Sequence, residues 1–212
     1  APRPAAWLQR PGLAGGIDQD GGRAAELLAC GFGSVEFGSV TAQPLPGQNV
    51  GVAALIQALK SALAAAPQGA VYGLGPCAVG IGLAVPSAVP LEQVAAQWMA
   101  GFAAAADVAH YVSLNLSARA HQRLLEPAGL AVLGTAFATV ASLRYQRSKP
   151  GGHGQTREVR LAIKLPATHP AASTVAALAV AAGIDQLTVV LPDTGERWAR
   201  VSALRRQIGP VP

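Results

Sequence analysis

The chain has 212 residues, which suffice for one large domain or two small ones. Of these residues 51% are hydrophobic and 13% charged, a composition that excludes a disordered tail protein. No uninterrupted apolar run reaches the roughly 18 residues typical of a membrane span, so we expect membrane contact only peripherally, through partners. The net charge of +5 makes the protein basic, but the charge alone does not identify a partner.

Short β-type runs alternate with alanine-rich helical patterns, which is typical of βα units in a parallel sheet. The expected strands are residues 12–17, 34–40, 79–84, 111–116, 159–165 and 186–191. The expected helices are residues 21–29, 52–66, a segment from 91, 130–145, 171–182 and a final basic segment 196–208. The glycine-rich residues 151–154 are expected to form a flexible loop tip.

Six such units curl toward a barrel, because successive βα crossovers are right-handed. A closed (β/α)8 barrel has eight strands, so we predict an α/β fold of the incomplete (β/α)8, TIM-barrel-like kind with about six βα units. Residues 1–195 are assigned to this barrel domain and residues 196–212 to a basic C-terminal tail. Both outer strands then carry unpaired edges, which invite association, and we expect the tail to cover the gap or dock on a partner.

The basic residues gather in the C-terminal third. Up to Ala141 there are six basic and seven acidic residues, whereas from Ser142 onward there are ten basic and four acidic ones. Such a surface can face RNA, anionic lipid or an acidic protein, or can simply be solvated. Because few aromatic residues lie among these charges and no RNA-binding signature appears, we expect neither DNA nor RNA as a partner.

Two cysteines, Cys30 and Cys77, cannot form a disulfide framework or a zinc site, and they favour a reducing compartment. We expect Cys30 to be packed at the end of a helix. The four histidines are scattered without paired spacing, so we expect no metal ion.

Several segments occur in a recognisable order. They read LAGGIDQDG (13–21), GFGSVEFGSVT (31–41), GIGL (80–83), YVSLNLS (111–117), AIKLP (162–166) and AGID (182–185). In this succession they resemble the class 2 dihydroorotate dehydrogenases. The resemblance implies a flavin enzyme of the bacterial inner membrane or the mitochondrion that oxidises dihydroorotate and reduces quinone.

The departures from that family fall on its catalytic groups. Where the family has a lysine for the substrate carboxylate, this chain has Gln19, and where it has the catalytic serine base, this chain has Ala118. Of the family's asparagine-rich substrate loop only Asn49 remains. Since a methyl group cannot accept a proton, we expect no catalytic residue and no dihydroorotate oxidation. Further family contacts are replaced by Gly82, Val85, Pro86, Pro192 and Asp193.

A fragment of the family's flavin site survives. The resemblance assigns to it Ala14, Gly15, Gly16, Ser39, Asn115 and Lys164, the last as the cation beside reduced flavin. The glycines also suit a tight turn without any ligand. The family's last two strands, whose loops hold the flavin phosphate on backbone amides, have no counterpart here, so we expect no cofactor, with FMN as the candidate if one binds.

Two functions stay open. The first is a catalytically inactive dihydroorotate dehydrogenase-like pseudoenzyme that acts as a structural or accessory subunit of a larger, mitochondrial, respiratory-chain assembly, with other protein subunits as partners. The alternative is a small FMN-binding oxidoreductase. A flavin absorbance spectrum of the purified chain distinguishes them.

Overall fold

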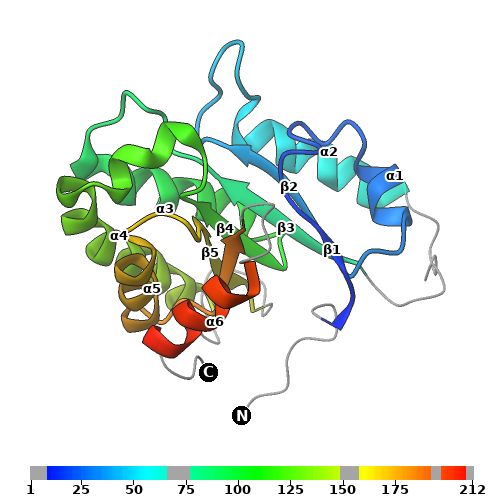
Figure 1. Cartoon of the computed structure of the whole chain (residues 1–212). Coiled ribbons are helices and arrows are strands. Elements are labelled where there is room, and N and C mark those ends of the chain that lie inside the picture. Colours follow the sequence, from blue (N-terminus) through cyan, green and yellow to red (C-terminus); the bar gives the residue numbers. More distant parts are fainter. Residues whose placement is uncertain (1–8, 66–76, 149–157, 192–196, 209–212) are drawn as a thin grey trace.

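The computed structural model describes residues 9–65, 77–148, 158–191 and 197–208. Its centre is one sheet of six parallel strands in chain order, with each strand hydrogen-bonded to the next. The strands are β1 (Gly12–Leu13), β2 (Ser34–Val40), β3 (Ala78–Leu83), β4 (Tyr111–Asn115), β5 (Arg160–Pro166) and β6 (Gln186–Val190). The sheet curls into an open half-barrel, as Figure 1 shows, which confirms the predicted incomplete (β/α)8-like fold.

Helices alternate with these strands and surround the sheet (Figure 1). They are α1 (Ala24–Ala29), α2 (Gly51–Ala65), α3 (Val94–Ala105), α4 (Pro127–Arg147), α5 (Ala172–Ala181) and α6 (Arg197–Ile208). Two 3-10 helices, η2 (Leu91–Gln93) and η3 (Arg119–Leu125), precede α3 and α4. Helix α4 begins three residues earlier than expected, because Pro127 needs no backbone donor in the first turn.

The hydrophobic core lies between the sheet and the helices. One strand face is uniformly apolar and buried, since Phe37, Ile81, Val112 and Leu161 follow one another in register across β2 to β5. Above them Trp98 of α3 stacks on Phe137 of α4, with ring centroids 5.9 Å apart. Aromatic stacking of this kind stabilises helix–helix contact beyond the area that it buries.

The opposite, concave face of the sheet is polar or small. Strand register places Glu36, Gly80 and Tyr111 in one row, Gly82, Ser113, Ala162 and Gln186 in the next, and Asn115, Lys164 and Thr188 in the third. Barrels of this type usually fill their interior with bulky branched residues. In this chain the concave face builds a polar site instead.

The predicted first strand, residues 12–17, is wrong in its length. Strand β1 has two residues, because the backbone turns at Gly16, whose φ of 106° suits glycine, and the Gly16 N–H donates to the Gly38 carbonyl. Other strand and helix boundaries differ from the expected ones by at most a few residues. The predictions at residues 151–154, Pro192 and Asp193 lie outside the described residues.

Helix α4 is the one described helix that could cross a membrane by length and composition. In the structure it lies beside α3 and α5, and Leu133, Phe137 and Val140 are buried on its inner side. A helix that covers an apolar sheet has the same composition, so α4 is accounted for as a core helix.

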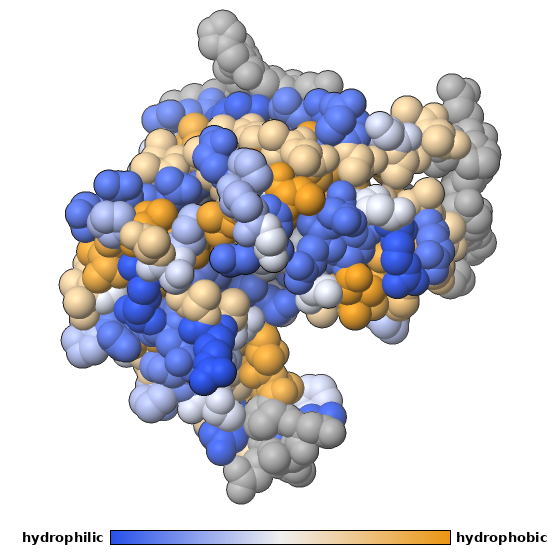
Figure 2. All heavy atoms as spheres, turned by 90° about the horizontal axis from the view of Figure 1, so that it is seen from above, coloured by the Kyte–Doolittle hydropathy of each residue, from blue (hydrophilic) through white to orange (hydrophobic). Residues whose placement is uncertain are grey.

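Over the residues that the structure describes, the half-barrel is open between β6 and β1. In the view of Figure 2 a notch separates two lobes, and a hydrophobic patch borders one side of it. Helix α6 confirms the expected basic C-terminal helix over the described residues 197–208. It packs on α5 through the buried Leu204, and the Ser173 hydroxyl donates to the side chain of Gln207.

Candidate functional site

A cavity of about 280 Å³ lies at the carboxyl ends of β2 to β4. Its wall comes from four loops: the turn after β1, the turn after β2, the segment after β3 and the start of η3. Parallel (β/α) barrels carry their active sites at this end, because the loops after the strands converge there. The position therefore matches that of a barrel active site.

The structure brings most of the expected flavin-site residues together. Gly15, Gly16, Ser39 and Asn115 all line this cavity. Gln19 and Ala118, at the family's carboxylate and base positions, line it too. Ala14 and Lys164 are not among the lining residues. The assignment of these residues to a cofactor stays a prediction.

Ser39 and Asn115 form the polar floor of the cavity. The Asn115 amide donates to the Ser39 hydroxyl at 2.8 Å, which links the end of β2 to the end of β4. The Asn115 amide oxygen accepts from both the backbone N–H and the hydroxyl of Ser117, each at 2.8 Å. These bonds hold the Asn115 side chain in one orientation.

Lys164 faces Glu36 on the concave face of the sheet. Its Nζ lies 3.5 Å from Glu36 Oε1, and the two side chains are 12% and 5% exposed. Burial raises the pKa of Glu36, and the neighbouring ammonium of Lys164 opposes that rise. A Cβ on Gly15 would lie 2.6 Å from the same carboxylate oxygen, so glycine leaves room for this pair.

Glu36 is a residue that the sequence reasoning missed. A lone carboxylate between Val35 and Phe37 in a buried strand needs a partner, and this was the available signal. The identity of that partner could not be read from the sequence, because it depends on how far the sheet curls.

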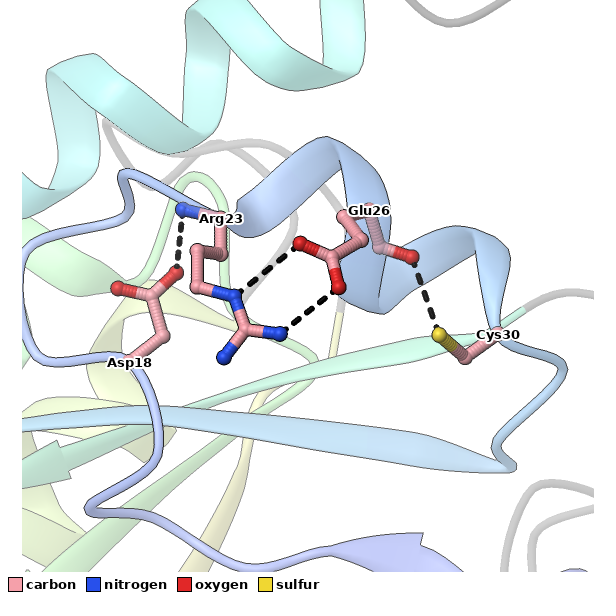
Figure 3. A network of polar contacts seen from close by, with 4 residues as sticks. All are labelled: Asp18, Arg23, Glu26 and Cys30. Atoms are coloured by element: carbon pink, nitrogen blue, oxygen red, sulfur yellow. Dashed lines mark hydrogen bonds and ion pairs between the residues drawn. The ribbon is translucent and has the colours of Figure 1, made fainter.

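Asp18, also missed, shapes the turn between β1 and α1. Its carboxylate accepts from the backbone N–H of Gly21 at 2.7 Å and of Arg23 at 3.0 Å. Arg23 in turn pairs with Glu26 (Figure 3).

The expectation that Cys30 is packed is wrong, because its thiol is exposed and donates to the Glu26 carbonyl at 3.3 Å.

Asn49 lines the cavity, yet its amide oxygen is already engaged. This oxygen accepts from the Thr41 N–H at 3.2 Å, the Thr41 hydroxyl at 3.0 Å and the Gly51 N–H at 3.0 Å. It therefore closes the turn between β2 and α2.

His121 forms part of the buried wall. Its Nε2 lies 3.0 Å from both the backbone nitrogen and the carbonyl oxygen of Val85. Burial lowers the pKa of His121, so the imidazole is neutral at pH 7. Within the described ranges, no group of three or more potential ligands is arranged to hold a metal ion.

Comparison with known proteins gives a consistent result. No family model matches the chain. A curated protein from Synechococcus sp. is 31% identical over 127 residues, which is 50% of this chain and 31% of that protein. One from Methylococcus capsulatus is 30% identical over 141 residues, or 55% of this chain and 38% of the relative. Both are described as dihydroorotate dehydrogenase (quinone).

This chain is similar to the quinone-type dihydroorotate dehydrogenases. The resemblance read from the sequence is thereby confirmed. The matched regions amount to about a third of the length of these curated relatives.

Two crystal structures of dihydroorotate dehydrogenase from Eimeria tenella share the fold. The complex with ferulenol has a TM-score of 0.67 at 18% identity and covers 94% of this chain and 66% of its own. The ligand-free form has a TM-score of 0.65 at the same identity. The half-barrel therefore corresponds to part of the dihydroorotate dehydrogenase fold.

Proposed function

We propose that this chain is a non-catalytic relative of dihydroorotate dehydrogenase that works as a structural or accessory subunit. The observation that carries the proposal is Ala118, which lies on the cavity wall at the position of the family's base. General-base help is worth about 10²–10⁴ in rate, and a methyl group supplies none of it. The neighbouring His121 does not replace it, because its Nε2 contacts the Val85 backbone and its Nδ1 is buried.

The proposal includes that the isolated chain holds no FMN. The family's cofactor carries a phosphate dianion, but no lysine or arginine is among the residues that line the cavity. Lys164, the expected cation, lies against Glu36. A phosphate dianion in this cavity would meet hydrogen-bond donors but no counter-charge, which supports this part of the proposal.

The assembly part of the proposal rests on the open edges of the sheet. Strand β6 has no neighbour beyond it among the described residues, and Val190 at its end is 40% exposed. Unpaired sheet edges are covered by a helix, a loop or another chain, and we propose another chain for this one. We extend the proposal to a mitochondrial, respiratory-chain assembly, supported by the resemblance and by the basic excess from Ser142 onward.

The test of catalysis combines the purified chain, added FMN, dihydroorotate and a quinone. The Methylococcus capsulatus relative in the same assay is the positive control. We expect no turnover above background and no flavin absorbance in the chain after dialysis. Turnover, or a stoichiometric flavin, would overturn the proposal and establish the alternative of a small FMN-binding oxidoreductase.

The test of assembly is a native mass measurement on the protein isolated from its source, together with fractionation of the source cells. A defined complex with other subunits in the mitochondrial fraction is expected. A monomer in every fraction would remove the accessory role.

A further inference from the structure

Helix α6 has one side against the rest of the protein and one side toward solvent. Leu204 is buried on α5, and the side chain of Gln207 accepts a hydrogen bond from the Ser173 hydroxyl of α5. These two positions mark the inner side of the helix, which lies beside α5 at the rim of the half-barrel in Figure 1. An α-helix turns by about 100° per residue, so the opposite side holds four exposed residues: Trp198, Ser202, Arg205 and Arg206.

This outer side combines a large aromatic ring with cations. Trp198 is 72% exposed, more than any other large hydrophobic side chain that the structure describes. Arg205 lies two helical turns further along and therefore stands in line with the indole, and Arg206 flanks it. Neither arginine forms an ion pair with another described residue. A single exposed tryptophan is ordinary on a protein surface, but tryptophan beside arginine is the composition of an interface hot spot.

The charge of α6 selects the chemistry of its partner. The helix carries four arginines and no acidic residue. Complementary charge steers association and excludes wrong partners, so the matching surface is acidic. A guanidinium group binds a carboxylate through two parallel hydrogen bonds, which a lysine cannot do. The indole between these cations additionally requires an apolar recess that can accept one ring.

A membrane surface fits α6 poorly. A helix that lies in a lipid interface buries a whole apolar side in the lipid. The apolar side of α6 is turned toward α5, where Leu204 is buried, and Trp198 is the one large apolar side chain on its outer side. Single-stranded RNA is also a poor fit, because such sites stack successive bases on several aromatic side chains.

A second copy of this chain is disfavoured by charge. The chain has a net charge of +5, so two copies repel one another. Three of its carboxylates, on Glu26, Asp107 and Asp185, already pair with arginines of the same chain. The partner is therefore a different and acidic protein.

We propose that the outer side of α6 is the docking surface for a partner subunit, with Trp198 as the anchor in an apolar recess and Arg205 and Arg206 paired with carboxylates that surround it. This inference rests on the proposed accessory role, and it adds the surface and the chemistry of the partner. It does not involve the cavity at the ends of the strands or the open edge of β6.

A photo-crosslinker at position 198 identifies what lies against the helix. The chain with p-benzoylphenylalanine in place of Trp198 is produced in the source cells, irradiated and analysed by mass spectrometry. We expect a crosslink to one peptide of a different protein, with several aspartates or glutamates around the crosslinked residue. The same group in place of Tyr145, which is 63% exposed on α4, is the matched control and should not reach that peptide. No crosslink from position 198, or one to lipid, RNA or this chain itself, overturns the proposal.

Two variants measure the contribution of the outer side. Trp198→Ser, and separately Arg205→Gln with Arg206→Gln, should each lower the fraction of the chain found in the native complex at least about ten-fold. Lys60→Gln with Arg119→Gln removes the same charge from exposed positions elsewhere and should leave that fraction unchanged. Resistance of α6 to trypsin should be the same in Trp198→Ser and in the native chain. If the double arginine variant unfolds α6, Trp198→Ser is the deciding measurement.

Sedimentation with vesicles that contain about 30% phosphatidylglycerol tests the lipid alternative directly. We expect no binding that depends on Trp198, and such binding would overturn the proposal. A complex that keeps both α6 variants as firmly as the native chain overturns this inference and leaves the accessory role standing. A native chain that is monomeric in every fraction overturns the accessory role and this inference with it.

Discussion

Lys164 Nζ lies 3.5 Å from Glu36 Oε1, although β3 and β4 separate their strands. Three strand spacings of about 4.8 Å would hold the two strands roughly 14 Å apart in a flat sheet. The long lysine side chain and the curl of the sheet together close this gap. The pair therefore joins β5 to β2 across the concave face.

Lys164→Met removes the counter-charge of Glu36 and should lower the free energy of unfolding by about 3 kcal/mol near pH 8. The folded-state pKa of Glu36 is raised above its ordinary value. Its contribution to stability therefore declines as the pH rises from the ordinary pKa to the raised one. Without Lys164 to oppose the rise, the decline should be larger. Denaturant unfolding at about pH 5 and about pH 8 should show a smaller loss at the lower pH.

The matched control is Lys60→Met on the exposed side of α2, which should change stability little at either pH. A Lys164→Met protein with the same loss at both pH values would contradict this account of Glu36.

Asp18→Ala should destabilise the protein by about 2 kcal/mol, because the backbone N–H groups of Gly21 and Arg23 lose a charged acceptor. Glu26→Ala breaks an exposed pair with Arg23 and should change the stability little. Thermal and urea unfolding of the two variants compare a buried turn with a surface ion pair. Equal losses would show that the Asp18 turn does not stabilise the fold.

Part of this structure could be predicted from the sequence. The apolar alternation around Val35, Phe37 and Ile81 predicts the buried strands, because the outer face is hydrophobic whatever the curvature. The length of β1 could not be predicted, since it depends on the Gly16–Gly38 backbone contact.

The candidate site was predictable to a smaller extent. Order along the chain places Ser39 and Asn115 at the carboxyl ends of β2 and β4, two strands apart, and the structure joins them by a hydrogen bond. The contact of Lys164 with Glu36 needs the curvature of the sheet, which no local pattern records. The burial of His121 likewise follows from how η3 folds against the segment after β3.

His121→Gln should reduce the sensitivity of the protein to acid. Burial lowers the folded-state pKa of His121 below its ordinary value, so the unfolded chain binds the proton more readily. Stability is therefore lost as pH falls from the ordinary value toward the lowered one. Urea midpoints measured at about pH 7 and about pH 5 should differ less in the variant than in the native chain. An unchanged difference would contradict the prediction.

Leu204→Ser should detach α6 from α5, because Leu204 is the buried apolar contact of this helix, with 8% exposure. A loss of about 2–3 kcal/mol is expected locally, and trypsin should cut the arginines of α6 faster. Trp198→Ser is the matched control, since Trp198 is 72% exposed. Equal proteolysis of the two variants would show that Leu204 does not hold the helix.

Deletion of all residues after Asp193 should cause aggregation.

The concave face of the half-barrel is polar, with Glu36, Ser113 and Lys164 where most barrels of this type carry branched aliphatic side chains. A half-barrel with an aliphatic concave face would expose a large apolar surface, and such a surface promotes aggregation. Under the proposed accessory role, this chain could finish folding before it meets another subunit, because the concave face of the described strands is polar rather than aliphatic. Under that proposal, its synthesis would not need to match that of a partner in time or amount.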